Sequence, residues 1–161
     1  MITISPNLQA FLATIRHSEG TDRAADPYRV VYSYNHTIVN LSDHPAVTGE
    51  WKGAPLDNLG PLYVGKISTA AGAYQIIKPT WLACKAQLQL RDFSGPSQDQ
   101  AAALLIRQRG ALELVNQGAF EDAVNRCSTV WASLPGANAG QPERTLADLT
   151  QTYTTAGGAL A

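Results

Sequence analysis

The segment from residue 21 to about residue 66 constrains the fold most, because it separates two helical patterns and is itself broken by turn-forming residues. These include Asp26-Pro27, Asp43-His44-Pro45 and Gly60-Pro61. Turn-forming residues at this density exclude a long helix. Runs of residues that favour β-strands lie at 28–32, 37–41 and 62–64. Loops of this length in compact domains carry a function or a small structure of their own. We therefore predict a small lobe, about 21–66, with a short, twisted sheet.

The segment before this lobe predicts one well-delimited helix. Ser5 is a good N-cap, Pro6 suits the first helical position, and Gly20 is placed as a terminating glycine. Apolar residues between them recur at i, i+3, i+4 and i+7, which defines one buried face: Leu8, Phe11, Leu12 and Ile15. Glu19 therefore lies at the C-terminal end of this helix.

The remainder of the chain predicts further helices. Ser68 or Thr69 is expected to cap a helix that runs through Ile77, and Ser97 to Gln100 is typical of a capping box. Apolar stripes then predict helices at about 101–109, 112–117, 120–131 and 146–156. The predicted fold class is α+β, mostly helical, with a single domain over residues 1–161.

Composition excludes several classes of protein. The 12 basic and 13 acidic side chains give a formal charge of −1, which argues against a duplex-coating nucleic-acid binder. Apolar runs fall short of the ~20 residues that span a bilayer, and the first residues do not have the pattern of a secretory signal. Cys84 and Cys127 have no partners at metal-ligand spacing, so we expect two free core thiols, with a single disulfide as the alternative.

Glu19 is the first candidate for chemistry. The negative pole of the helix dipole disfavours an ionised carboxyl at this position, and burial would disfavour it further. Both effects raise the pKa of a carboxyl toward that of a general acid working near neutral pH. The structural alternative is a solvated Glu19 that pairs with Arg16 or Arg23.

The run from Ser68 to Gln75, Ser-Thr-Ala-Ala-Gly-Ala-Tyr-Gln, is the second candidate. Small residues let a backbone approach a ligand closely, and a hydroxyl, a phenol and an amide accompany them. Such a wall suits a neutral, hydroxyl-rich polymer such as a glycan; the alternative is an ordinary capped helix start. For Asp43-His44 we favour a structural role, since adjacent loop residues seldom face each other.

Five blocks together resemble the lambda-type phage endolysins, a family of lysozyme-like lytic transglycosylases. They cover nearly the whole chain in order: Arg16 to Asp22, Tyr28 to Val30 with Ser42 to Pro45, Ser68 to Gln75, Leu88 to Ser97, and Arg126 to Ser128 with Trp131 to Gly136. The resemblance implies a two-lobed, lysozyme-like fold with a glycan groove between a small β-containing lobe and a helical lobe.

The resemblance also implies an activity. Members cleave the β-1,4 bond between N-acetylmuramic acid and N-acetylglucosamine of peptidoglycan and release a 1,6-anhydro product. Glu19 matches the catalytic glutamate, and Ser68, Thr69, Tyr74 and Gln75 match glycan-binding positions. No cofactor or metal is implied. We expect a monomer with peptidoglycan strands as its partner, without nucleic-acid or stable membrane binding, that leaves the host cytoplasm for the wall at lysis.

Two alternatives remain open. One is a hydrolytic muramidase that uses Asp22, Asp26 or Asp43 as the second carboxylate of a two-carboxylate mechanism. The other is a non-catalytic glycan-binding or virion-structural module of the same fold. The chain departs from the family pattern at 138–140, where Asn-Ala-Gly stands in place of a common Gly-Tyr-Gly, so one aromatic contact to a sugar is expected to be missing.

Overall fold

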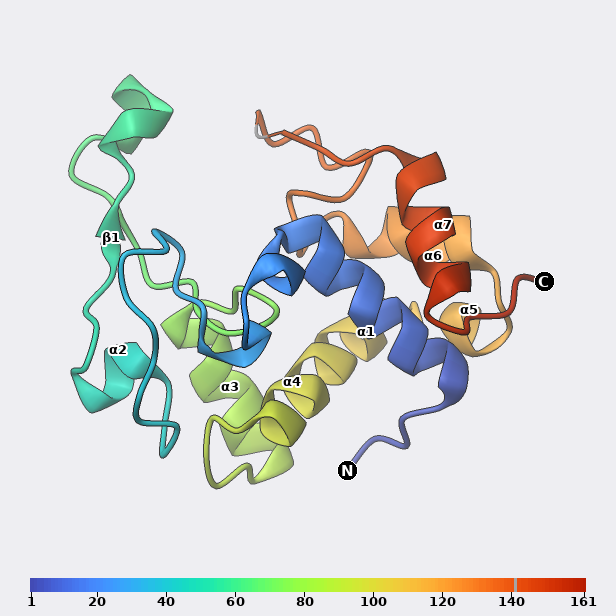
Figure 1. Cartoon of the computed structure of the whole chain (residues 1–161), viewed down its shortest axis with the longest axis horizontal. Coiled ribbons are helices and arrows are strands. Elements are labelled where there is room, and N and C mark those ends of the chain that lie inside the picture. The colour runs from blue at the N-terminus through green and yellow to red at the C-terminus, as the bar shows by residue number, and fades with distance from the viewer. Residues whose placement is uncertain (141) are drawn as a thin grey trace.

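The computed structural model describes residues 1–140 and 142–161, in which helices dominate and one two-stranded sheet lies to one side (Figure 1). This agrees with the predicted α+β class. The elements in chain order are α1 (Pro6–Glu19), η1 (Thr21–Arg23), η2 (Pro27–Arg29), α2 (Pro45–Thr48), β1 (Ala54–Pro55), η3 (Asp57–Leu59), η4 (Pro61–Tyr63), β2 (Ile67–Ser68), α3 (Lys78–Leu88), α4 (Gly95–Gln108), α5 (Leu112–Asn116), α6 (Phe120–Cys127) and α7 (Leu146–Thr155), where η marks a single 3-10 turn.

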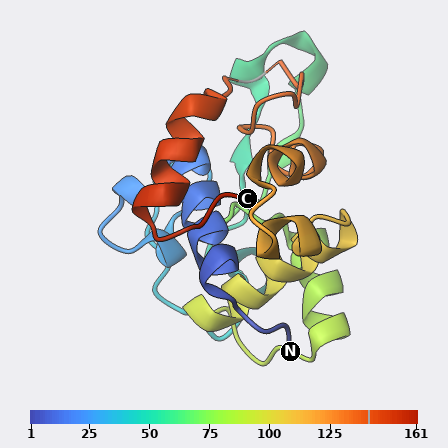
Figure 2. The same cartoon turned by 90° about the vertical axis from the view of Figure 1, so that its right-hand side faces the viewer.

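Helix α1 has the predicted ends. The Ser5 side chain accepts a hydrogen bond from the backbone N–H of Leu8 at 3.1 Å. Gly20 adopts the left-handed conformation with φ of 77°, and its N–H returns to the carbonyl of His17. The predicted apolar face is buried, and α1 packs against α4, α5 and α7 (Figures 1 and 2). Glu19 is thereby carried on the central helix of the molecule.

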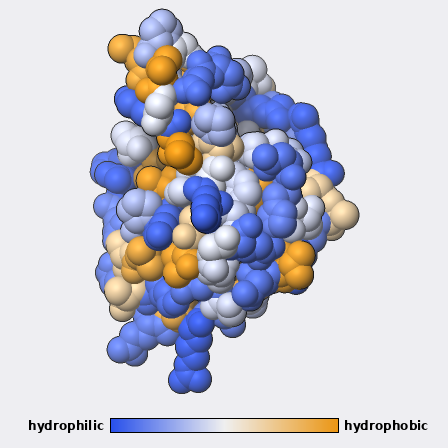
Figure 3. Space-filling model, turned by 90° about the vertical axis from the view of Figure 1, so that its left-hand side faces the viewer, coloured by the Kyte–Doolittle hydropathy of each residue, from blue (hydrophilic) through white to orange (hydrophobic). Residues whose placement is uncertain are grey.

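The small lobe contains less sheet than the sequence predicts, and in different places. Strands β1 and β2 pair antiparallel, with Ala54 opposite Ser68. The runs 28–32 and 37–41 form no paired strands among the described residues; they meet at an isolated bridge between Val30 and Thr37 and through the Arg29 side chain, which donates to the carbonyls of Ile38 and Val39. The run 62–64 is not a strand: residues 62 and 63 belong to η4 and Val64 follows it as the cap residue, because Gly60 and Pro61 start a 3-10 turn there. Apolar side chains gather at the tip of this lobe (Figure 3), where Leu62, Val64 and Ile67 are exposed.

Two predicted helix starts are wrong. Residues 69–77 form a turn in which Ala71 bridges both Val31 and Ile76, and α3 begins only at Lys78. Helix α4 begins at Gly95 after the N-cap residue Ser94, so the expected capping box at 97–100 lies inside its first turns. In the part of the chain that the structure describes, no helix is both long and apolar enough to cross a bilayer.

Cys84 and Cys127 are unpaired and buried, which confirms the expectation of two free core thiols. Burial raises the pKa of the Cys84 thiol to about 11 and that of Cys127 to about 12. We therefore expect both thiols to react slowly with a thiol-specific chromogenic reagent in the folded protein and at once in denaturant. A reducing agent should leave the melting temperature unchanged; an intact mass that rises on reduction would contradict this prediction.

Candidate active site

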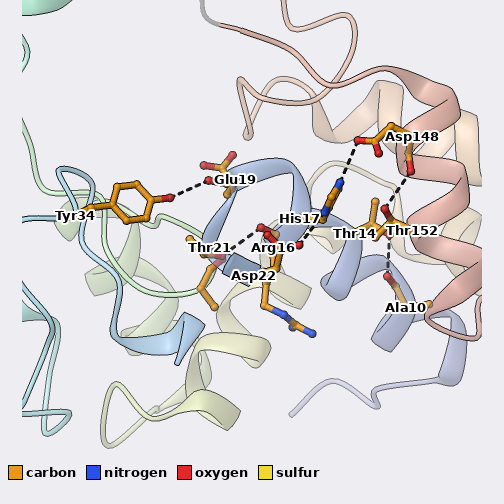
Figure 4. Close-up of polar contacts among 11 residues, drawn as sticks. Ala10, Thr14, Arg16, His17, Glu19, Thr21, Asp22, Tyr34, Asp148 and Thr152 are labelled. Atoms are coloured by element: carbon orange, nitrogen blue, oxygen red, sulfur yellow. Dashed lines mark hydrogen bonds and ion pairs between the residues drawn. The ribbon is translucent and has the colours of Figure 1, made fainter. Parts of the chain in front are cut away.

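Glu19 is the last residue of α1, and Gly20 turns the chain away immediately after it. Its carboxyl receives a hydrogen bond from the hydroxyl of Ser133, with 2.5 Å between Oγ and Oε1. Ser18 supports that hydroxyl by donating its own to the Ser133 Oγ at 2.7 Å. On the other side, the Tyr34 hydroxyl donates to the Glu19 backbone carbonyl at 3.4 Å (Figure 4). The carboxyl therefore lies where the small lobe and the helical lobe meet.

The electrostatic setting of Glu19 favours its protonated form. Burial raises the pKa of the carboxyl, and the hydrogen bond from Ser133 offsets only part of this rise, because it stabilises the carboxylate. The position at the C-terminal end of α1 acts in the same direction as burial. A half-buried carboxyl with a raised pKa is suited to deliver a proton near neutral pH.

Arg16, one of the two basic partners that the structural alternative names for Glu19, binds elsewhere. Its guanidinium donates to the hydroxyl of Tyr74 at 2.7 Å, and that hydroxyl donates to Asp99 at 2.5 Å. Tyr28 donates to the same Asp99 oxygen at 3.0 Å. The arginine is thus part of a polar network that joins α1 to the turn at 69–77 and to α4.

A cavity of about 650 Å³ opens in the small lobe. Ser33 and Asn35, which flank Tyr34 in the chain, line one side of it, and the β1–η3 segment lines the other. Tyr34 itself, whose hydroxyl reaches the Glu19 backbone, lines a different pocket, which it shares with Asp26, Arg29 and His36. The complete lining of the first cavity mixes hydroxyl, amide and carboxyl groups with apolar surface: Tyr32, Ser33, Asn35, Ala54, Pro55, Asp57 and Asn58.

Tyr74 does not fit the expectation of a glycan contact. Its side chain is only 1% exposed, and its hydroxyl is held between Arg16 and Asp99. Tyr74 instead supports the surrounding structure: its backbone carbonyl accepts a hydrogen bond from the indole of Trp131 at 3.0 Å. The sequence pattern could not distinguish a phenol that faces a groove from one that faces the core.

The other three predicted glycan contacts, Ser68, Thr69 and Gln75, have partly exposed side chains. The Ser68 hydroxyl accepts from the N–H of Ala70, and the Thr69 hydroxyl accepts from the N–H of Lys78. Gln75 has a positive φ of 48° and lines a pocket of about 260 Å³ together with Trp131. Contacts from these three to a ligand remain a prediction.

The aspartates considered as a second carboxylate each bind a basic side chain. Asp22 lies 2.7 Å from the ring of His17, and Asp26 lies 3.1 Å from Arg29. Asp43 pairs with Lys85 and also accepts from the indole of Trp81 at 2.8 Å. Figure 4 shows the Glu19 carboxyl directed away from Asp22.

The structural role favoured for Asp43-His44 agrees with their contacts. Burial raises the pKa of Asp43, but the hydrogen bonds from Lys85 and Trp81 outweigh it and leave the pKa lowered. The His44 ring is fully buried, with Nε2 3.0 Å from the carbonyl of Ile76. Within residues 1–140 and 142–161, we find no group of three His, Cys, Asp or Glu side chains that could hold a metal ion.

The sequence analysis did not identify Ser133 or Tyr34 as site residues. Ser133 is 114 positions from Glu19 in the chain, and no local pattern marks one serine among others as the partner of a distant carboxyl. Tyr34 becomes conspicuous in the folded chain, where it has a positive φ of 55° and 60% of its surface exposed; a positive φ is unusual for a tyrosine.

Comparison with known proteins gives one consistent result. A family model described as Endolysin matches residues 9–160. The endolysin of Escherichia phage P2 is 39% identical over 162 residues, which cover 98% of this chain and 97% of that protein. The endolysin of Escherichia phage lambda is 37% identical over 163 residues, covering 98% and 96%.

Solved structures agree with these matches. Bacteriophage lambda lysozyme complexed with a chitohexasaccharide superposes with a TM-score of 0.85 at 36% identity, and each chain is covered completely. A second structure, of lysozyme from bacteriophage lambda, gives a TM-score of 0.83 at 35% identity, again over both complete chains. The predicted lysozyme-like, two-lobed fold is thereby confirmed.

Proposed function

The chain belongs to the endolysin family, and from this premise we propose that it is a lytic transglycosylase of peptidoglycan. It would cleave the β-1,4 bond between N-acetylmuramic acid and N-acetylglucosamine and leave a 1,6-anhydro-muramic end. The observation that carries the proposal is the contrast between Glu19 and the nearby aspartates. Glu19 has a raised pKa and accepts a hydrogen bond from a neutral hydroxyl, whereas Asp22, Asp26 and Asp43 are bound to basic side chains.

One carboxyl is enough for this reaction. Protonated Glu19 gives its proton to the glycosidic oxygen while the bond to the anomeric carbon breaks through an oxocarbenium-like state. The resulting carboxylate then accepts the proton of the muramic 6-hydroxyl as that oxygen bonds to the anomeric carbon of the same sugar. Because the nucleophile is intramolecular, its effective concentration is high and no second carboxylate is needed to activate water.

The glycan would lie across the end of α1, where Tyr34 of the small lobe reaches the Glu19 backbone. The lambda lysozyme complex with a chitohexasaccharide supports an extended sugar chain as the ligand of this fold. Ser68, Thr69 and Gln75 are the proposed contacts because their side chains are partly exposed, and Tyr74 is a positioning residue. We further propose that the chain acts as one domain and as a monomer, and that it reaches the wall when the host lyses.

Product analysis tests the reaction type. Purified peptidoglycan digested with the enzyme should yield fragments that end in anhydro-muramic acid, as measured by mass spectrometry. Reducing muramic ends would reject the transglycosylase and favour the hydrolytic muramidase. In that case, replacement of Asp22, Asp26 or Asp43 by Asn should abolish activity about as fully as replacement of Glu19.

Ser133→Ala is expected to lower the maximal rate about tenfold, since a hydrogen bond to a charged group is worth ~1.5–3 kcal/mol. The lost bond is the one that stabilises the Glu19 carboxylate at the moment when the proton leaves. Its loss also leaves burial unopposed, so the pKa of Glu19 should rise further. A pH series of peptidoglycan cleavage rates should therefore show the alkaline limb at higher pH.

Ser128→Ala is the matched control for this prediction. Ser128 is a neighbouring serine whose hydroxyl donates to the carbonyl of Asn125 and not to Glu19. Its variant should keep the wild-type pH profile. An alkaline limb that stays in place in Ser133→Ala would contradict the assigned contact.

A further inference from the structure

Three consecutive residues at the end of α1 bind the C-terminal part of the chain. Ser18 and Glu19 both contact the hydroxyl of Ser133, and the His17 Nε2 lies 3.0 Å from a carboxylate oxygen of Asp148 in the first turn of α7. The other ring nitrogen, Nδ1, lies 2.7 Å from Asp22 in η1. Figure 4 shows the His17 ring between these two carboxylates.

The two contacts of His17 determine which protons the ring carries. An ionised carboxylate only accepts hydrogen bonds, whereas a neutral imidazole has one N–H and one lone pair. A neutral ring could therefore satisfy Asp22 or Asp148 but would direct a lone pair at the other. Both contacts are favourable together only when both ring nitrogens carry a proton.

The two other charged side chains in the last turn of α1 are engaged elsewhere. On α1 itself, Arg16 binds Tyr74 and Glu19 binds Ser133. The groups that face the ring from the elements packed against it are Asp22 of η1 and Asp148 of α7. Their side chains are 35% and 43% exposed, against 24% for His17, so the ring is the most enclosed member of the three.

A continuous set of contacts leads from this trio to the catalytic carboxyl. Thr145 caps α7 by accepting from the N–H of Asp148, and the preceding Arg144 donates its N–H to the carbonyl of Ser133 at 2.9 Å. Ser133 in turn donates its hydroxyl to Glu19. A displacement of the start of α7 would thus move the Ser133 hydroxyl that binds the Glu19 carboxyl.

We propose that His17 is an imidazolium clamp, bonded to Asp22 and Asp148, which holds the start of α7 in place and so positions Ser133 on Glu19. The inference deepens the proposed function and rests on it for the role of Glu19. His17 is a positioning residue: it contacts neither the groove nor the carboxyl, and it acts through Ser133.

The protonation state can be tested on the wild-type protein without any variant. Side-chain ¹⁵N NMR distinguishes protonated from unprotonated ring nitrogens, and the three histidines give an internal comparison. At about pH 7, His17 should show two protonated nitrogens. His44 should show one, because its Nδ1 accepts from the N–H of Ala46 and burial lowers its pKa. A neutral pattern at His17 under these conditions would overturn the clamp.

A double-mutant cycle tests the route through Ser133. His17→Gln should lower kcat for glycan-strand cleavage about fivefold with KM changed less than about twofold, because the catalytic group is misplaced while the groove is intact. In the Ser133→Ala background the same substitution should cost less than about twofold. Equal effects in both backgrounds would overturn the positioning role.

His36→Gln is the matched control for the cycle. His36 is also partly buried but binds a single carboxylate, Glu50, within the small lobe, so its loss should give the same kcat effect in both backgrounds.

Failure of the proposed function is distinguishable from failure of the clamp. Reducing muramic products would reject the transglycosylase reaction alone, while the NMR result and the cycle, which follows bond cleavage of either type, would still stand.

Discussion

Glu19→Gln is expected to reduce the rate of peptidoglycan cleavage by at least about a thousandfold, since positioned proton transfer contributes ~10²–10⁴ and this residue serves in both directions. Gln has the same shape but no proton of suitable acidity to give. It can still bind Ser133, so the geometry at the end of α1 should persist. The loss of turbidity of a peptidoglycan suspension measures the effect directly.

The same substitution should not destabilise the fold. Because burial raises the pKa of Glu19, the folded protein holds this proton more tightly than the unfolded chain does. Ionisation of Glu19 therefore lowers the free energy of unfolding as the pH rises from the ordinary carboxyl pKa, about 4.3, through the raised pKa of the folded protein. A neutral amide removes that cost, and thermal unfolding near neutral pH should give a melting temperature equal to or above that of the wild type.

Glu113→Gln is the control, because Glu113 is an exposed carboxyl on α5. It should retain full activity. If Glu19→Gln still cleared peptidoglycan at a rate near that of the wild type, Glu19 could not be the acid. A non-catalytic module would be favoured if the wild type itself bound peptidoglycan without clearing it. Binding of the Gln variant to peptidoglycan in a sedimentation assay separates lost chemistry from lost affinity.

Gln98→Leu is expected to lower the free energy of unfolding by about 3 kcal/mol or more, as each unsatisfied buried polar group costs ~1–3 kcal/mol. The Gln98 side chain is 1% exposed. It accepts from the N–H of Ala73 at 2.8 Å and donates to the carbonyls of Phe93 and Tyr28 at 2.7 and 3.0 Å. Leu would leave all three backbone groups without this partner.

The loss of the Gln98 contacts should also disturb the candidate active site, because Gln98 joins α4 to the turn at 69–77 and to the small lobe. Urea denaturation measures the loss in stability, and Gln108→Leu on the exposed part of the same helix is the control. A loss below about 1 kcal/mol in Gln98→Leu would mean that water or a shifted backbone replaces the missing amide.

Helix ends with a local chemical signature were predictable from the sequence. Ser5, Pro6 and Gly20 delimit α1 by contacts within a few residues of each other, and Glu19 could be placed at its end for the same reason. The buried stripe of α6 was also predictable, because its period follows from the helix itself.

The errors occur where distant residues decide the local structure. Ser68 joins β2 because Ala54 pairs with it, and Gly72 lies in a turn with φ of 78°, where a side chain would meet Gln98. Ser97 was predicted to cap a helix, yet its hydroxyl donates to Asp92. The same reason explains why Ser133 was missed: its importance rests on contacts that only the folded chain creates.

The shielding of both native thiols makes this protein convenient for site-directed spectroscopy. Cys84 and Cys127 are buried and unpaired, so a single cysteine introduced at an exposed position would be labelled selectively under native conditions. Leu62, 81% exposed at the tip of the small lobe, offers such a position. A fluorophore attached there would report how the two lobes approach each other without removal of any residue from the interior.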